Sequence, residues 1–282
     1  MFRRLLMLCA FLACSPVALA QHKAYKEVES SLLVTGTIDV TPTGEVATYA
    51  LKESEKLPTG IVDMVASVAP HWKFEPIALQ DKAVSRSEMS LLFIAKKQEN
   101  GKFSLNLRSA YFMAPPAAGK EEQLAFDKTD FKPPVYPLSL QYDGVAANVY
   151  VAIKVGRDGR VIDADVMQID LRKVGSQPQL QRWRNAFKRS ALAAANNWTF
   201  HVPTAGSNAG QAYWVGTVPI SYAFDGELPA YGSWQTYVPG PYTVIPWMSD
   251  KHIADRDPGA MSPNTFHAEG ESRRLLTPLG GG

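Results

Sequence analysis

The chain has 282 residues, of which 46% are hydrophobic and 20% are charged, an ordinary globular composition with apolar material for one or two small cores. Its 29 basic and 27 acidic side chains leave a formal charge of only +2, so the charge balance does not indicate a nucleic-acid-binding protein. Its two cysteines, Cys9 and Cys14, both lie within the first twenty residues.

Residues 1–20 have the pattern of a cleavable Sec-type signal peptide. Arg3-Arg4 supplies a positive start, Leu5–Leu12 is an apolar run, and Ala18-Leu19-Ala20 is a small-x-small cleavage signal. The apolar run is shorter than the roughly 20 residues that span a bilayer, which favours cleavage over anchoring. We therefore expect a periplasmic or secreted protein without cysteine, which excludes disulfides, thiol catalysis and cysteine metal sites. Acylation of Cys14, as in a lipoprotein, is the less favoured alternative.

Residues 21–112 are expected to form a first domain, a small antiparallel sheet with one short helix. Apolar residues alternate in two segments on either side of the turn Pro42-Thr43-Gly44, and helical spacing follows them. A Trp72-x-Phe74-x-Pro76 segment then ends the helical region. The expected strands are 36–40, 46–51, 87–96 and 102–112, and the helical stripe consists of Ile61, Met64, Val65 and Val68.

Residues 113–132 are rich in proline, alanine, glycine and charge, which predicts a linker. A second domain is expected over residues 133–225. Its first strand, 148–156, alternates strictly, and Arg157-Asp158-Gly159-Arg160 follows as a hairpin turn into a returning strand at 161–166.

A helix is predicted to begin at Ser176-Gln177-Pro178-Gln179, which is a capping box with proline in the first turn. Apolar residues then recur at helical spacing to about Asn196, and residues 213–224 have the pattern of the last strand. The buried stripe of this helix consists of Leu180, Trp183, Phe187, Ala191 and Ala194.

The two domains repeat one order of elements: strand, glycine turn, returning strand, helix and a Trp-x-Phe segment. Gly44 corresponds to Gly159, and Trp72 corresponds to Trp198. The offsets differ, as they do in diverged repeats. We therefore predict an α+β protein of two related units, each a small antiparallel sheet packed against helices.

The second unit resembles the TonB C-terminal domain family, whose members include energy transducers of Gram-negative bacteria. The resemblance covers residues 133–225 and depends on four segments in order, with the first unit a more diverged match. These segments are Pro134-Val135-Tyr136-Pro137, Arg157–Val161, Asn197-Trp198-Thr199-Phe200 and Val218–Phe224.

The resemblance implies a partner-binding module rather than an enzyme, in which an exposed strand edge receives an extended peptide. Similar proteins hold the N-terminal segment of an outer-membrane receptor in this way and serve transmembrane transport. The matching edge strand here comprises Tyr213, Trp214, Val215, Gly216, Thr217, Val218, Ile220, Ser221 and Tyr222, and the motif before the domain comprises Pro134, Tyr136 and Pro137. That motif could bind a partner, but a structural role is favoured. Pro219 lacks an N–H and blunts the edge if that position faces outward.

The chain departs from a complete energy transducer. It has a cleavable signal in place of an N-terminal membrane helix, and its linker of about twenty residues reaches at most ~70 Å. We therefore expect a TonB-like protein without coupling to a membrane motor.

The remaining features favour structural interpretations. Trp72, Phe74, Trp198 and Phe200 are expected in cores rather than on a ligand platform. Arg182, Arg184, Lys188 and Arg189 are expected on a solvated helix face. The five histidines lack ligand spacing, and no motif indicates a nucleophile, a phosphate loop or a cofactor, so we predict no catalytic, cofactor or metal site.

Residues 226–282 are predicted to form a proline- and glycine-rich tail that is disordered beyond about Ser249. Its aromatic residues are expected to pack on the second domain; they are Tyr231, Trp234, Tyr237, Tyr242 and Trp247.

Two alternatives to peptide binding stay open. In one, the protein is structural and its two units pack on each other or pair in a homodimer through their edges. In the other, a small molecule binds in the groove between the units.

Overall fold

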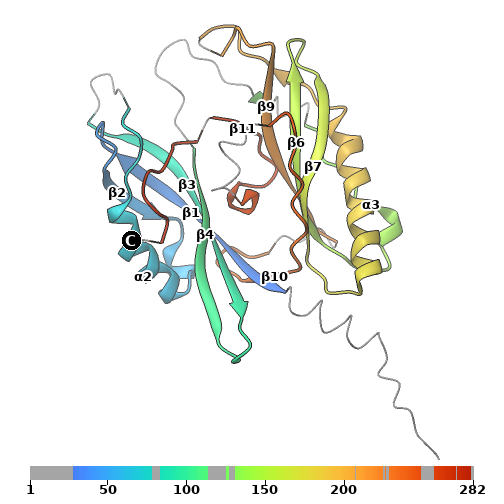
Figure 1. Ribbon diagram of the computed structural model, residues 1–282, viewed down its shortest axis with the longest axis horizontal. Coiled ribbons are helices and arrows are strands. Elements are labelled where there is room, and N and C mark those ends of the chain that lie inside the picture. The colour runs from blue at the N-terminus through green and yellow to red at the C-terminus, as the bar shows by residue number, and fades with distance from the viewer. Residues whose placement is uncertain are drawn as a thin grey trace, which may run out of the picture.

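The computed structural model describes residues 28–77, 83–113, 125–126, 131–206, 208–224, 226, 229–248, 257–270 and 272–280. The molecule is built in layers, with one helix on each outer side and two antiparallel sheets inside them (Figure 1). Part of the C-terminal tail lies between the sheets, and its end lies beside α2 (Figure 1). The α+β class is thereby confirmed. The predicted signal peptide and most of the predicted linker lie outside the described residues. No helix in the described part of the chain is long and apolar enough to cross a membrane.

The first sheet has strand order β10-β1-β3-β4, with β2 also paired to β1. Helix α2 covers one face, where alternate residues of β1 and β3 form the core with Ile61 and Val65 of the helix. The elements are β1 (Glu29–Val40), β2 (Val46–Leu51), α2 (Thr59–Val68), β3 (Ser85–Lys97), β4 (Phe103–Met113) and β10 (Gln235–Tyr237), with 3-10 turns at Ser54–Lys56 and Ala69–His71. Strand β1 begins earlier than the predicted residue 36, because Leu32 and Val34 continue its buried face.

The second sheet has strand order β11-β9-β6-β7, and α3 covers its outer face (Figure 1). Helix α3 starts at the predicted capping box, where the Ser176 backbone N–H donates to Gln179 Oε1 at 2.9 Å. The elements are β6 (Ala147–Gly156), β7 (Val161–Leu171), α3 (Gln177–Ala195), β9 (Tyr213–Tyr222) and β11 (His267–Ala268), with 3-10 turns η3 (Leu138–Leu140) and η5 (Pro258–Ala260). A small separate ladder joins β5 (Ala125–Phe126) to β8 (Phe200–His201).

The two sheets share a local topology. In each, the first strand lies in the middle, its hairpin partner lies on one side, and the strand after the helix lies on the other. The turn glycines Gly44 and Gly159 both have positive φ, and each carbonyl accepts a hydrogen bond from the Trp-x-Phe segment, from Phe74 N at 2.7 Å and from Phe200 N at 2.8 Å. A Cβ at either glycine would overlap the carbonyl oxygen of that phenylalanine. Both positions therefore require glycine, because each Trp-x-Phe segment passes directly against the turn.

The aromatic residues of these crossing segments are core residues, as predicted. Trp72, Phe74, Trp198 and Phe200 are all buried. Each indole N–H donates to a carbonyl of a segment that lies outside the repeated elements, Trp72 to Leu279 in the tail and Trp198 to Lys132. The tail therefore completes the core of the first unit.

The expectation of disorder beyond about Ser249 is wrong for residues 257–270 and 272–280, which form η5, β11 and a segment bonded to β4. Arg273 N donates to Phe112 O at 2.8 Å, and Leu276 N donates to Lys73 O at 2.7 Å. Local composition does not predict this structure, because the tail is ordered by backbone hydrogen bonds to strand edges that lie far away in the sequence.

The prediction that the tail aromatics pack on the second domain is also only partly right. Tyr231 and Trp234 pack against the core of the first sheet, and the Tyr237 hydroxyl donates to Glu29 of β1 at 2.9 Å. Trp247 packs on the inner face of the second sheet, and Tyr242 contacts Met167 of β7. The tail therefore contacts both sheets.

Replacing Gly159 by alanine should lower the free energy of unfolding by about 2–4 kcal/mol, because the new Cβ overlaps Phe200 O and the backbone has positive φ. The matched control is Gly101→Ala, which has a similar φ of 80° but open space around its Cα. That control should lose only about 1 kcal/mol. Urea denaturation measures the free energy of unfolding of both variants. Equal losses would show that the close approach of Phe200 O to Gly159 does not contribute to the cost of the substitution.

Candidate functional site

The predicted edge strand is β9, and its inner side is fully paired with β6. Trp214, Val218 and Ile220 point to the α3 core, whereas the alternate residues face the first sheet. Pro219 lies opposite Tyr150, and its carbonyl points outward, where it accepts from Asn264 N at 2.7 Å. Because the N and C=O of one residue in a strand point to the same side, Pro219 removes an N–H from the outer edge, as the sequence suggested.

The outer edge of β9, expected to be open, is occupied by the chain's own tail over residues 215–219. Strand β11 runs antiparallel to it, with His267 opposite Thr217 and Ala268 opposite Gly216. Glu269 N donates to Val215 O at 2.9 Å and extends the pairing beyond the bridged residues. The expectation of an open edge is wrong because an exposed strand edge carries unpaired N–H and C=O groups, and the nearby tail segment forms hydrogen bonds with them.

The tail docks on β9 through one specific side chain as well as through its backbone. Phe266 is only 8% exposed, and its ring centre lies 5.1 Å from that of Phe200 in the core beneath α3. A Cβ at Gly216 would overlap the Phe266 ring. Gly216, one of the predicted edge residues, therefore forms a slot for an aromatic side chain of an added strand.

His267 ties the docked tail to the first sheet. Its ring is 2% exposed, and it packs edge-on against Tyr111 of β4 with ring centres 4.7 Å apart. Its Nε2 lies 2.9 Å from the Ser262 carbonyl, and Nδ1 is buried without a hydrogen-bond partner among the described residues. Burial lowers the pKa of this imidazole, so the docked form favours the neutral ring.

The motif before the second domain, Pro134, Tyr136 and Pro137, does not join the β9 outer edge. The Tyr136 hydroxyl donates to Val145 O at 2.8 Å, and its ring packs edge-on against Phe187 of α3. Pro137 precedes the 3-10 turn η3. These contacts hold the start of the domain against α3.

The cationic face of α3 is only partly a solvated surface. Arg182 pairs with Asp143 at 3.0 Å and Lys188 pairs with Asp165 at 2.7 Å, both in exposed surroundings. Arg184 differs, because its guanidinium donates to the tail carbonyl of Pro239 at 3.0 Å. The helix therefore also holds the tail where it crosses β7.

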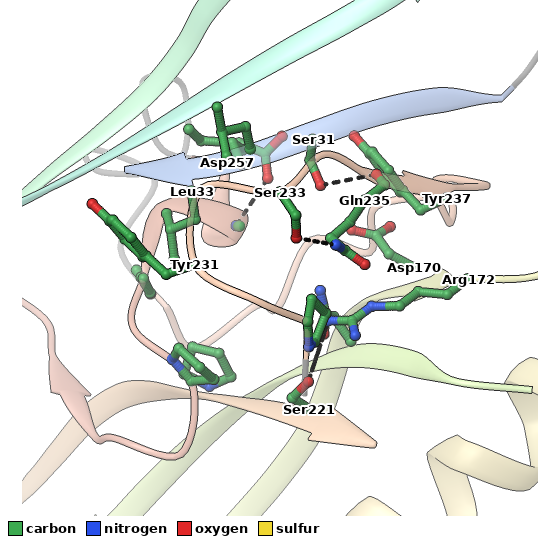
Figure 2. A pocket seen from close by; sticks show the side chains of 18 of the residues that line it. Ser31, Leu33, Asp170, Arg172, Ser221, Tyr231, Ser233, Gln235, Tyr237 and Asp257 are labelled. Atoms are coloured by element: carbon green, nitrogen blue, oxygen red, sulfur yellow. Dashed lines mark hydrogen bonds between the residues drawn. The ribbon is translucent and has the colours of Figure 1, made fainter. Parts of the chain in front are cut away.

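A cavity of about 300 Å³ lies next to β9, between the inner faces of the two sheets. In Figure 2, Asp170 and Arg172 extend from the end of β7, Ser31 and Leu33 come from β1, and Tyr237 and Asp257 come from the tail. The ends of β6 and β9 complete the wall with Asn148, Tyr150, Pro219, Ile220 and Ser221. The groove between the units that the sequence suggested therefore exists, and the tail forms part of its wall.

Sequence reasoning missed the tail residues that cover β9 and the polar residues of the cavity. The tail pairing involves two bridged residues, too few for an alternating pattern, although Phe266 within a polar stretch was a usable signal. The cavity charges had a clearer signal, since Asp170 and Arg172 alternate with the apolar Leu171 on the face that turns away from α3.

Comparisons with known proteins assign no family to the chain, because no family model, curated protein or solved structure matches it significantly. In the described part of the chain, no group of three or more His, Cys, Asp or Glu side chains could hold a metal ion.

Acidification should release the tail from β9. An undocked imidazole binds a proton near its ordinary pKa of 6.5, whereas the docked His267 has a lowered pKa. Docking stability is therefore present above pH 6.5 and decreases as pH falls through that value. Hydrogen-exchange protection of the Asn264 and Glu269 amides should fall accordingly, by up to tenfold per pH unit.

His267→Gln is the control, because glutamine keeps a donor for the Ser262 carbonyl and does not titrate. Its protection should change little between pH 7.5 and 5.5. The same pH dependence in both proteins would rule out His267 as the cause.

Proposed function

We propose that the protein binds an extended peptide by strand addition at the outer edge of β9. The observation that carries this proposal is the docked tail: residues 264–269 occupy the edge as a short antiparallel strand, with Phe266 in the slot at Gly216. An incoming peptide with an aromatic side chain at the same register would make the same contacts. Main-chain hydrogen bonds would supply affinity, and the Gly216 slot would supply selectivity.

Binding of a partner requires the tail to leave, so tail and peptide compete for β9. The apparent dissociation constant of the peptide is its intrinsic value divided by the fraction of molecules with a free edge. The tail is joined to the rest of the chain on both sides of the segment, which gives it a high effective concentration. The tail is therefore a built-in competitor that sets a threshold for partner affinity.

The wider setting of this proposal is an exported, TonB-like adaptor. It is supported by the signal pattern of residues 1–20, by the family resemblance of residues 133–225, and by the common strand topology of the two sheets. In this setting the protein acts in the periplasm, and the partner segment comes from an outer-membrane receptor. Mass spectrometry of the native N-terminus tests the export step, since an intact Met1 would exclude cleavage.

An assembly role is the second candidate, and a separate observation favours it. The tail also closes other edges: β10 pairs with β1, Val238 pairs with Leu171 at the end of β7, and Ser272 pairs with Met113 of β4. A chain that closes its own edges in this way could be a structural unit with no peptide ligand. In that case no peptide would displace the tail.

Peptide titrations should separate the two candidates. The ligands are a synthetic peptide of residues 262–270 and N-terminal segments of outer-membrane receptors, measured by fluorescence anisotropy. Phe266→Ala should strengthen their binding at least tenfold, because loss of a buried phenylalanine costs the docked tail about 3–5 kcal/mol. Adding Thr217→Pro to that variant should abolish binding, since it removes an outward N–H of the edge.

Phe103→Ala is the matched control, because this ring is 67% exposed on β4 and should leave peptide affinity unchanged. Binding that survives Thr217→Pro with the fold intact would contradict strand addition. Absence of binding to the Phe266→Ala variant would favour the assembly role, which light scattering would then test.

A further inference from the structure

The cavity between the sheets is lined by a partly buried arginine, Arg172, that forms no ion pair with a described residue. Arg172 Nη2 donates to the neutral Asn148 Oδ1 at 2.8 Å and Ser221 Oγ at 3.3 Å. No carboxylate of the described residues lies within ion-pair distance of it, and burial lowers the pKa of its guanidinium. Arg108 differs, since it pairs with Glu29 at 3.0 Å. Arg172 therefore keeps its Nε and Nη1 donors available to the cavity.

A second donor in the same cavity also lacks a partner. Tyr150 lies on the central strand β6 and is only 4% exposed, yet its hydroxyl has no hydrogen bond with any described residue. Burial raises the pKa of this phenol well above its ordinary value, so it stays a protonated donor. Because Tyr150 lines the cavity, its hydroxyl can donate a hydrogen bond to a group that enters it.

The cavity contains acceptors as well as donors. Asp170 Oδ1 accepts from Gln168 Nε2 at 2.8 Å and from the tail amide of Gly240 at 3.0 Å. Asp257 Oδ1 accepts from Gly259 N at 3.0 Å, and its Oδ2 lies 3.7 Å from Arg108 Nη1. These carboxylates would repel a simple anion, so the cavity suits a ligand that carries both signs of charge.

We propose that this cavity binds a small zwitterion of the amino-acid or dipeptide class. The ligand carboxylate accepts hydrogen bonds from Arg172 and Tyr150, and its ammonium group donates toward Asp170 and Asp257. Guanidinium groups pair with carboxylates through two parallel hydrogen bonds, which fixes the orientation of the ligand. The volume of about 300 Å³ is at the lower end of small-molecule sites, and Leu92 and Tyr231 provide an apolar wall for a side chain.

Isothermal titration of the full exported chain tests the proposal with a matched set of ligands. These are leucine and alanyl-leucine, with N-acetyl-leucine lacking the ammonium group and leucinamide lacking the carboxylate. The zwitterions should bind, and each blocked form should bind at least tenfold more weakly. Failure of both zwitterions to bind, or equal binding of the N-acetyl form, would overturn the proposal.

Variants locate the site. Arg172→Gln should weaken zwitterion binding about 10- to 100-fold and Tyr150→Phe about 5- to 30-fold, as expected for hydrogen bonds to a charged group. Tyr150→Phe keeps the test decisive if Arg172→Gln does not fold. The control is Arg86→Gln, an arginine that is 70% exposed and pairs with Asp39 outside the cavity, and it should bind like the parent protein. Zwitterion binding that neither cavity variant changes would overturn the proposal.

The pH dependence gives an independent readout for the ammonium end. Burial raises the pKa of Asp170 to about 6, so its charged form is depleted below that pH. The charged and titratable groups that face it are Arg172 on its own segment, Arg184 of α3, Tyr150 of β6, and Tyr237 and Asp257 of the tail. Leucine does not titrate near pH 6. Its affinity should rise about tenfold as pH increases from 5 to 7, and Asp170→Asn should remove the rise; a parent protein with flat affinity would contradict the assignment.

Discussion

The outer edge of β9 is the constraint on which the arrangement of this molecule depends. A three-stranded antiparallel unit leaves its last strand with unpaired N–H and C=O groups on one side. The first sheet covers that side of β3 with its own next strand, β4, through a short hairpin. In the second sheet, no such hairpin strand follows β9 among the described residues, and β9 is instead covered by residues 264–269, more than forty positions further along the chain. The two units thus differ most where a partner could add a strand.

The tail links the edge of β9 to the cavity. Before it reaches β9, it contributes Tyr237, the Gly240 amide and Asp257 to the region around Asp170. A ligand that contacts these groups would hold the tail in its docked position, and release of the tail would remove part of the cavity wall. By thermodynamic reciprocity, a cavity ligand and a β9 peptide would therefore weaken each other's binding.

The sequence predicted those features that depend on local chemistry. The turn glycines, the capping box at Ser176 and the buried Trp-x-Phe segments each arise from a few adjacent residues, and the structure confirms them. The tail could not be predicted in this way, because its order depends on the missing side chain of Gly216 and on edges far away in sequence. The cavity likewise joins residues from β1, β6, β7, β9 and the tail, so no single spacing indicates it.

A reversible disulfide between the tail and β9 tests most directly whether a partner peptide binds at the outer edge of β9. Val215 and Glu269 are joined by a backbone hydrogen bond, and the only native cysteines lie in the predicted signal peptide. Strand neighbours of this kind lie close to the Cα separation of about 4.4–6.8 Å that a disulfide requires. In the Val215→Cys, Glu269→Cys protein, peptide binding should be absent when the disulfide is formed and should return on reduction. Equal binding in the oxidised and reduced forms would show that the β9 edge is not where the partner binds.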